Sequence, residues 1–355
     1  DRASLRASYA GEELDVGGFE MELEGVTSRV SGRLPLALAL GREPELPERE
    51  MDLVLDIPNG DLALLPQLLP PIGYAAGRYE IDARVRGTPK HPDLGGTVIV
   101  SDARVRLAGR EELFEQGRAR FTLGSREITL DSLTAIQSSR GRNPGRVWGK
   151  GVVRLDGLAL RDYEFQMAMR NVTAVEPGVY VANFDGDFQV TRGPRVGGAT
   201  VPLVTSDNVS IRQAVVLFDF TRQTEEDQVQ ASTQPLYWLY RLQLTAVNNL
   251  RWTPPDADIE FSADLTVEQT PDSLLLYGDM RALRGTYYFL ANRFTVQQAD
   301  LTFDNVNGLD PVLDAEATMR LVTAAADPSE PPVPHTVRVR LQGRSSKPDI
   351  EFTSD

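Results

Sequence analysis

The feature that most constrains this chain is a strict alternation of apolar and polar residues. The alternation is clearest between residues 258 and 268, where every second side chain is apolar. These apolar residues are Ile259, Phe261, Ala263, Leu265 and Val267. Because successive side chains of a strand point to opposite faces of a sheet, the segment predicts a strand with one apolar and one polar face. A sheet of such strands must cover its apolar face, either by closing on itself or by holding an apolar molecule.

The same two-residue period recurs through most of the chain, and helical signals are almost absent. Apolar residues with this period include Phe121, Leu123, Phe165, Met167, Phe188, Val190, Leu313, Ala315, Ala317, Met319, Val337, Val339 and Leu341. Turn sequences rich in Gly, Pro and Asn separate the alternating segments, for example at 58–60 and 197–198. Together these patterns predict an all-β fold.

One short helix is predicted between Asp61 and Leu69. Asp61 is a candidate N-cap, leucines follow at positions 62, 64, 65, 68 and 69, and a Pro-Pro pair ends the segment. Because Pro66 limits the length of the helix, we expect a single turn that plugs one end of a groove.

Internal echoes indicate how the sheet is organised. Segments 87–94 and 343–350 share a Gly, four intervening residues, a Pro-Asp pair and an aliphatic residue. Segments 82–86 and 102–106 both read Asp-Ala-Arg-Val-Arg. Degenerate repeats of strand and turn predict a sheet that grows along one axis.

Composition excludes several classes of function. The formal net charge is -14, which disfavours nucleic acid and anionic membrane surfaces as partners. The chain has no cysteine, so it has no thiol nucleophile, thiolate metal site or disulfide. No run of residues reaches the roughly 20 apolar positions of a membrane span.

The sequence offers little material for catalysis. Its two histidines, His91 and His335, are expected in a solvated turn and at the end of a Pro-rich loop. The acidic pairs at 185/187 and 256/258 could supply calcium ligands, but we interpret them as solvated pairs, and we interpret 304–310 as a turn. We therefore predict no enzymatic activity, no cofactor and no metal site.

A set of short motifs in the last quarter of the chain resembles a known family. The motifs are Gly278-Asp279-Met280, Arg284-Gly285-Thr286-Tyr287-Tyr288, Phe294-Thr295-Val296, Leu301-Thr302-Phe303, Asp310-Pro311-Val312, Val337-Arg338-Val339 and Pro348-Asp349-Ile350. In order and spacing they resemble the C-terminal domain of TamB, a component of the translocation and assembly module of diderm bacteria. The leucine segment after Asp61 and the 87–92 turn extend the resemblance upstream to about residue 50.

The resemblance implies a β-taco, which is a long curled sheet with a hydrophobic interior, and membership of the AsmA-like group of bridge-forming lipid-transfer proteins. It implies a repeat-like groove over residues 1–250, continuous with a C-terminal groove domain over 251–355. It also implies a periplasmic location, an inner-membrane anchor outside this sequence, phospholipid as ligand, and a BamA-like outer-membrane barrel partner of the TamA type for the full-length protein.

These expectations lead to a set of residues that would line a lipid groove. They are Phe121, Leu123, Phe165, Met167, Phe188, Ile259, Phe261, Ala263, Leu265, Val267, Leu313, Ala315, Ala317, Met319, Val337, Val339 and Leu341. A charge at Phe261 or Ala315 is expected to block lipid occupancy, whereas changes at Glu260 or Glu316 are expected to have no effect.

Two other functions fit the same pattern. A chaperone or scaffold for outer-membrane protein assembly would bind unfolded strands along an open sheet edge. A closed solenoid acting as an adhesin or polysaccharide-binding stalk would have a filled interior and exposed aromatic rows. Periodicity alone does not separate these from a lipid conduit.

Overall fold

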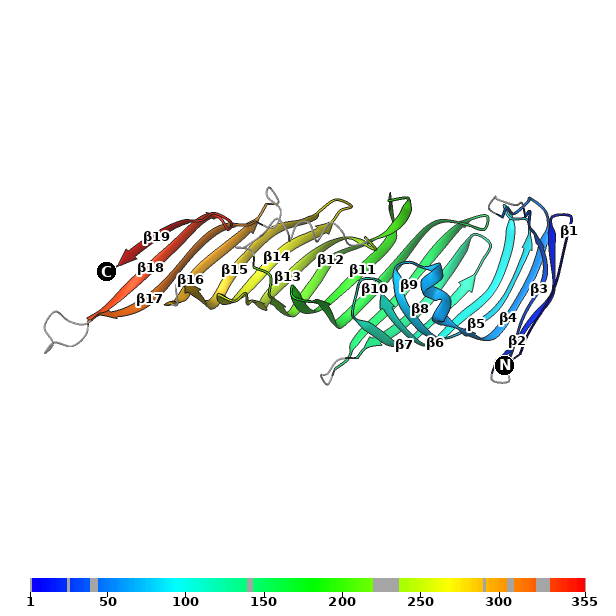
Figure 1. The fold of residues 1–355 in the computed structure, drawn as a ribbon, viewed down its shortest axis with the longest axis horizontal. Helices are drawn as coiled ribbons and strands as arrows, with labels where there is room; N and C mark the ends of the chain where they lie inside the picture. Colours follow the sequence, from blue (N-terminus) through cyan, green and yellow to red (C-terminus); the bar gives the residue numbers. More distant parts are fainter. Residues whose placement is uncertain are drawn as a thin grey trace. The chain divides into compact units, whose positions relative to one another are not determined.

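The computed structural model describes residues 2–23, 26–38, 44–138, 143–219, 236–289, 292–304, 310–323 and 333–354. Most of these described residues are in strands, and the 19 strands among them belong to one open sheet (Figure 1). The prediction of an all-β, open-sheet fold is confirmed. The chain divides into two compact units, residues 1–169 with 188–194, and residues 170–187 with 195–355.

The first unit is an antiparallel meander in which each strand pairs with the next along the chain. Its strands are β1 (Arg2–Ala10), β2 (Glu13–Leu23), β3 (Val26–Pro35), β4 (Met51–Asp61), β5 (Ile72–Gly87), β6 (Pro92–Leu107), β7 (Leu113–Leu123), β8 (Glu127–Gln137) and β9 (Gly145–Asp156). Two further strands, β10 (Ala159–Glu176) and β11 (Tyr180–Val196), contribute residues to both units.

The second unit continues with β12 (Ala199–Val216), β13 (Leu239–Trp252), β14 (Ala257–Gln269), β15 (Leu274–Phe289), β16 (Asn292–Phe303), β17 (Val312–Thr323), β18 (Val333–Arg344) and β19 (Asp349–Ser354). Strands β12 and β13 run parallel, and every later neighbouring pair is antiparallel. The indole Nε1 of Trp252 donates a 2.7 Å hydrogen bond to the carbonyl of Phe218, which fixes the end of β13 against the segment that follows β12.

Bulges bend the strands of the first unit. Asp102 and Gln116 have left-handed backbones, each with a φ of 51°. The β6–β7 register shifts between Val100 and Ala103, next to Asp102, and the β7–β8 register shifts beside Gln116. Because an extra residue on one strand increases local twist and bends it, these bulges bend β6 and β7.

Among the described residues, the apolar face of the second unit forms the largest cluster of buried hydrophobic side chains. Phe261, on β14, is only 1% exposed and packs among residues of β13 to β16. The buried members of this cluster are Ala214, Ala246, Leu250, Trp252, Ala257, Ile259, Phe261, Leu265, Leu276, Met280, Ala299, Leu301 and Phe303. The alternation seen in the sequence therefore places these residues in a core.

The polar positions of the strands carry cross-strand pairs between Arg and carboxylates. Arg84 donates to both carboxylate oxygens of Asp52, at 2.9 and 2.8 Å, and Arg281 donates to Asp300 at 2.9 Å. These side chains are largely solvent-exposed, so each pair adds little to stability. Their regular spacing still favours one strand register, because a one-residue slip would put charges on the apolar face.

The predicted short helix is present. Residues Leu62–Leu64 form a 3₁₀ turn that continues into α1 (Leu65–Leu68), and Oδ1 of Asp61 accepts a 2.9 Å hydrogen bond from the backbone N–H of Ala63. Asp61 is therefore the N-cap expected from the sequence. No helix in the described part of the chain is long and apolar enough to cross a membrane.

The echo between segments 87–94 and 343–350 corresponds to two hairpins with the same pairing. In the first, Val85 pairs with Leu94 and Arg86 with Asp93, and in the second, Leu341 pairs with Ile350. The loop of each hairpin begins at a glycine with positive φ. The φ is 83° at Gly87 and 97° at Gly343. The repeated sequence thus encodes a repeated strand connection.

Candidate apolar ligand site

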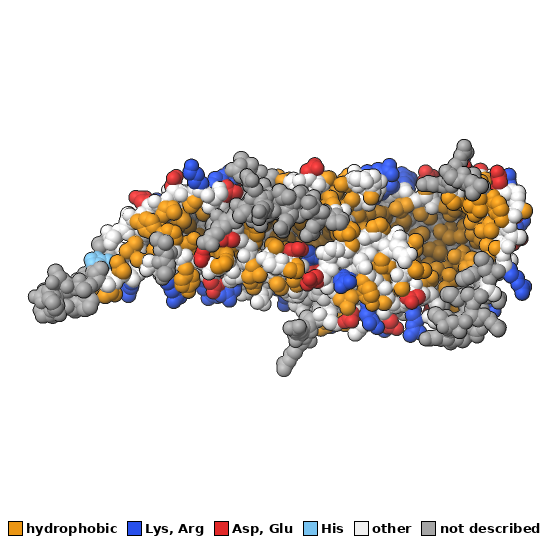
Figure 2. All heavy atoms as spheres, in the orientation of Figure 1, with side chains coloured by type: hydrophobic (Ala, Val, Ile, Leu, Met, Phe, Trp, Pro, Cys, Tyr) orange, Lys and Arg blue, Asp and Glu red, His pale blue; other side chains and the backbone are white. Residues whose placement is uncertain are grey.

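The first unit contains a cavity of about 660 Å³ between its strands and the leucine turn, which we define as residues 62–69. Figure 2 shows apolar side chains gathered in a hollowed face of this unit. The lining residues are Asp61, Leu62, Leu64, Leu65, Leu68, Leu69, Ile72, Tyr79, Ile81, Val98, Val100, Ala103, Val105, Leu107, Phe114, Gly117, Arg118, Ala119, Phe121, Leu133, Ala135, Val147, Met167 and Met169. The strand contributors lie mainly at alternate positions of β5 to β10, as a single sheet face requires.

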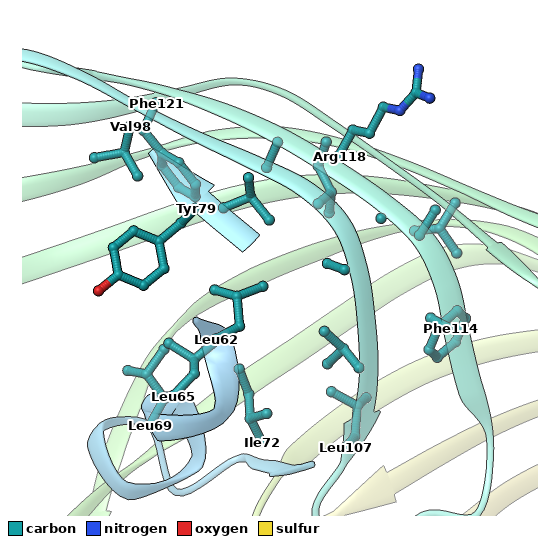
Figure 3. A pocket seen from close by; sticks show the side chains of 18 of the residues that line it. Leu62, Leu65, Leu69, Ile72, Tyr79, Val98, Leu107, Phe114, Arg118 and Phe121 are labelled. Atoms are coloured by element: carbon teal, nitrogen blue, oxygen red, sulfur yellow. The ribbon is translucent and has the colours of Figure 1, made fainter. Parts of the chain in front are cut away.

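Few of the residues that line this cavity have polar side chains. Among its residues, Asp61, Tyr79 and Arg118 have polar side chains. Figure 3 shows that the Arg118 guanidinium points away from the cavity that Leu62, Ile72 and the other labelled apolar side chains surround. The walls therefore suit the hydrocarbon part of a ligand, which gains free energy by leaving water.

The leucine turn forms one wall of this cavity. Leu62 is 7% exposed and packs with Ala75 and Ala103 of the sheet, whereas Leu64 and Leu68 are 63% and 74% exposed. Backbone hydrogen bonds of 2.9 Å, from Leu69 to Leu65 and from Ile72 to Leu69, close the turn. Leu62 thus anchors the turn to the sheet, whereas Leu64 and Leu68 line the cavity and remain accessible to solvent. The sequence predicted the turn but did not assign its leucines to the lining.

A smaller cavity of about 260 Å³ lies in the second unit. Six aromatic residues line it: Trp252, Phe261, Tyr287, Phe289, Phe294 and Phe352. Its remaining lining residues are Ile259, Val296, Ala299, Leu301, Leu313, Ala315, Glu316, Ala317, Val339, Leu341, Ser345, Ser346, Pro348 and Ile350. The free volume of this cavity is less than half of that of the first cavity.

The residues predicted to line a groove divide among different places. Phe121 and Met167 line the larger cavity. Ile259, Phe261, Leu313, Ala315, Ala317, Val339 and Leu341 line the smaller one. Leu265 belongs to the large buried cluster, and Ala263 and Val267 pack against it. Met319 and Val337 pack against a second cluster, which consists of Phe294, Ala317 and Val339. Leu123, Phe165 and Phe188 line neither cavity, and their role in binding lipid stays a prediction.

Glu260 has a structural role that the sequence did not reveal. Its carboxylate accepts a 3.1 Å hydrogen bond from the backbone N–H of Asn249, at a β13 bulge, and a 2.6 Å bond from Arg284. These bonds hold the pKa of Glu260 below its usual range. Glu260 is therefore an unsuitable neutral control for Phe261.

Three of the four carboxylates considered as calcium ligands accept hydrogen bonds from arginine. Asp185 accepts a 3.0 Å hydrogen bond from Arg212, and Asp187 accepts a 2.8 Å bond from Arg170. Asp258 is bonded in the same way by Arg251, at 2.6 Å. Across the described residues, no group of three or more His, Asp or Glu side chains is placed to hold a metal ion. Segment 304–310 lies mostly outside the described residues.

His91 lies in the turn expected for it. Its backbone exchanges hydrogen bonds with Thr88, and its side chain is 88% exposed. His335 lies in β18, opposite Leu321, rather than in the preceding loop.

The fold and the cavities define a class of protein. Its members have an open β-sheet whose apolar face borders cavities lined mainly by apolar side chains. The family model of the TamB C-terminal domain matches residues 135–355, which is more than half of the chain. The chain therefore belongs to the TamB family, and the resemblance seen in its sequence is confirmed. No curated protein matches it.

Membership places the chain in a family of envelope proteins that serve lipid or protein transport and assembly, and this family is not known for catalysis. The match runs from 135 to the end and so includes residues of both compact units. The expected division at residue 250 stays a prediction.

Proposed function

We propose that this chain is a non-enzymatic segment of a periplasmic lipid conduit, which carries phospholipid acyl chains in an apolar β-groove between the inner and outer membranes. The observation that carries the proposal is the cavity of about 660 Å³ with an almost entirely apolar lining. Family membership supports a transport role, and the cavity favours lipid over protein as the cargo.

The proposed mechanism is physical. Each methylene group that leaves water for an apolar surface gains about 0.8 kcal/mol, so a lined groove can replace the bilayer interior for an acyl chain. A lining of aliphatic side chains without fixed polar partners gives many similar positions along the groove. The chain could then slide without meeting a deep energetic trap, while its headgroup stays in water.

The proposed setting follows the family. The full-length protein would have an inner-membrane anchor outside this sequence and would meet a BamA-like outer-membrane barrel of the TamA type. Nucleic acid has no part in the proposal, because the net charge of -14 would repel it.

A matched pair of variants on β7 tests the lipid ligand. Phe121 lines the cavity, and its neighbour Arg120 is exposed on the other face of the same strand. Phe121→Asp should reduce co-purified phospholipid at least tenfold, because burying a carboxylate among hydrocarbon costs several kcal/mol. Arg120→Asp should leave occupancy unchanged. Native mass spectrometry with lipid extraction measures occupancy, and circular dichroism checks the fold of both variants.

Three results would contradict the proposal. The first is equal lipid occupancy in folded Phe121→Asp and wild-type protein. The second is a lipid-free wild-type protein that also refuses added labelled phospholipid. The third is displacement of bound lipid by an extended apolar peptide at lower concentration than by phospholipid, which would favour the chaperone function.

A further inference from the structure

We propose that the polar face of β7 to β9 binds an acidic polysaccharide, with Trp148 as the surface on which a sugar ring stacks and the cations around it as partners of the sugar carboxylates. This face lies on the other side of the sheet from the larger cavity, because Val147 lines the cavity and Trp148 is the next residue of β9. The proposal therefore does not rest on lipid binding. We define the Trp148 face by five exposed residues: Arg118, Thr134, Arg146, Trp148 and Lys150.

The strand register brings these five residues together. Arg118 of β7 pairs with Thr134 of β8, and Thr134 pairs with Trp148 of β9, so the three residues form one row across three strands. Figure 3 shows that the guanidinium of Arg118 points away from the cavity, as this row requires. Arg146 and Lys150 lie two positions before and two positions after Trp148, and therefore on the same face of β9. The indole is 40% exposed and has a cation on either side along its own strand.

The cations of the Trp148 face are not neutralised by the fold. Other polar positions of the sheet pair Arg with a carboxylate on a neighbouring strand. Among the described residues, no carboxylate forms an ion pair with Arg118, Arg146 or Lys150. The register gives the reason, because Arg118 lies opposite Thr134, and Arg146 lies opposite Ile136. Three cations are therefore available to an anionic ligand.

The chemistry of the Trp148 face favours an acidic polysaccharide over other anions. An indole face packs against the C–H groups of a sugar ring, and guanidinium groups bind carboxylates with paired hydrogen bonds. Strands β7 to β9 are paired on both sides, so an extended acidic peptide cannot join them as a further strand. The net charge of -14, with Glu115 and Asp131 at the border of the face, opposes a densely charged nucleic acid. A polysaccharide with one carboxylate per sugar ring satisfies both conditions.

Binding of polygalacturonate oligomers to the whole chain tests the proposal, because each sugar ring of this probe carries one carboxylate. Microscale thermophoresis measures the affinity. The oligomer should bind about tenfold or more tightly than its neutral methyl ester, which lacks the charge, and than polyglutamate of the same charge, which lacks the sugar ring. Equal binding of the methyl ester would show that the cations have no role, and equal binding of polyglutamate would show that the face recognises charge alone. Either result overturns the proposal, as does a chain that does not bind polygalacturonate.

Two variants locate the binding on the Trp148 face. Trp148→Ala should lower the affinity for polygalacturonate about tenfold, and Arg118→Gln should lower it about threefold. Tyr277→Ala and Arg281→Gln are matched controls in the second unit, because they remove an aromatic ring that is 38% exposed and an exposed cation. Both controls should leave the affinity unchanged, and circular dichroism checks the fold of all four variants. Equal affinity of folded Trp148→Ala and wild-type protein would overturn the proposal.

Discussion

At the scale of single residues, two neighbouring glycines of β6 differ in whether the fold leaves room for a side chain. Gly96 has a φ of +136°, and a Cβ there would overlap the carbonyl oxygen of Asp82 on β5. Gly95 has no such φ, and no atom lies within 4 Å of the position that its Cβ would take. The sequence shows the two glycines only as a turn-like pair, because the close approach of β5 is a property of the folded sheet.

These glycines give a matched test. Gly96→Ala should lower the free energy of unfolding by about 1–3 kcal/mol or more, because it adds backbone strain and a clash with β5. Gly95→Ala should change it by less than about 0.5 kcal/mol or stabilise slightly. Urea unfolding followed by circular dichroism measures both. Equal effects of the two changes would mean that the β5–β6 approach does not constrain Gly96.

At the scale of elements, the leucine turn illustrates how one segment serves both packing and the cavity. Its leucines look equivalent in the sequence, since all five follow a helical spacing after Asp61. In the fold, Leu62 is buried against Ala75 and Ala103, whereas Leu68 is 74% exposed. Stability should therefore depend on position within the turn and not on hydrophobicity alone.

Leu62→Ala should destabilise the protein by about 2–5 kcal/mol, since it removes buried methyl groups and leaves a void. Leu68→Ala, the same chemical change at an exposed position, should fall within about 0.5 kcal/mol of wild type. Chemical unfolding of the two variants side by side gives the comparison. If Leu68→Ala proved as costly as Leu62→Ala, the exposed side of the turn would have to pack against something in solution.

At the scale of the whole molecule, carboxylates that accept hydrogen bonds in the folded state make the free energy of unfolding depend on pH. Hydrogen bonds from Arg84 hold the pKa of Asp52 below its usual range, and Arg170 and Arg281 do the same for Asp187 and Asp300. Burial raises the pKa of Asp310, but hydrogen bonds from its serine neighbours and the nearby Arg344 outweigh burial and lower it overall. A carboxyl whose pKa is lower in the folded state stabilises that state above its unfolded pKa of about 4.

The urea midpoint should therefore be constant from pH 7 to about pH 5 and should fall as the pH drops further through the lowered pKa values. Asp310→Asn should lower stability at pH 7 and reduce this pH dependence, because the buried carboxylate that accepts from Ser345 at 2.6 Å and Ser346 at 2.8 Å is gone. A midpoint that rises between pH 5 and pH 3 would contradict the assigned direction of the shifts.

The all-β fold, the N-cap at Asp61 and the repeated strand connections could be predicted from the sequence, because two-residue periodicity and turn chemistry are local properties. The family could be recognised from the order and spacing of short motifs in the last quarter of the chain. The tertiary structure alone decided which apolar residues border free volume. Phe121 and Phe188 share the same alternation, yet Phe121 lines the larger cavity and Phe188 is buried at 8% exposure away from both cavities. Alternation specifies the face on which a side chain lies, whereas the space in front of it depends on bulges, on the leucine turn and on the bulk of residues from distant strands.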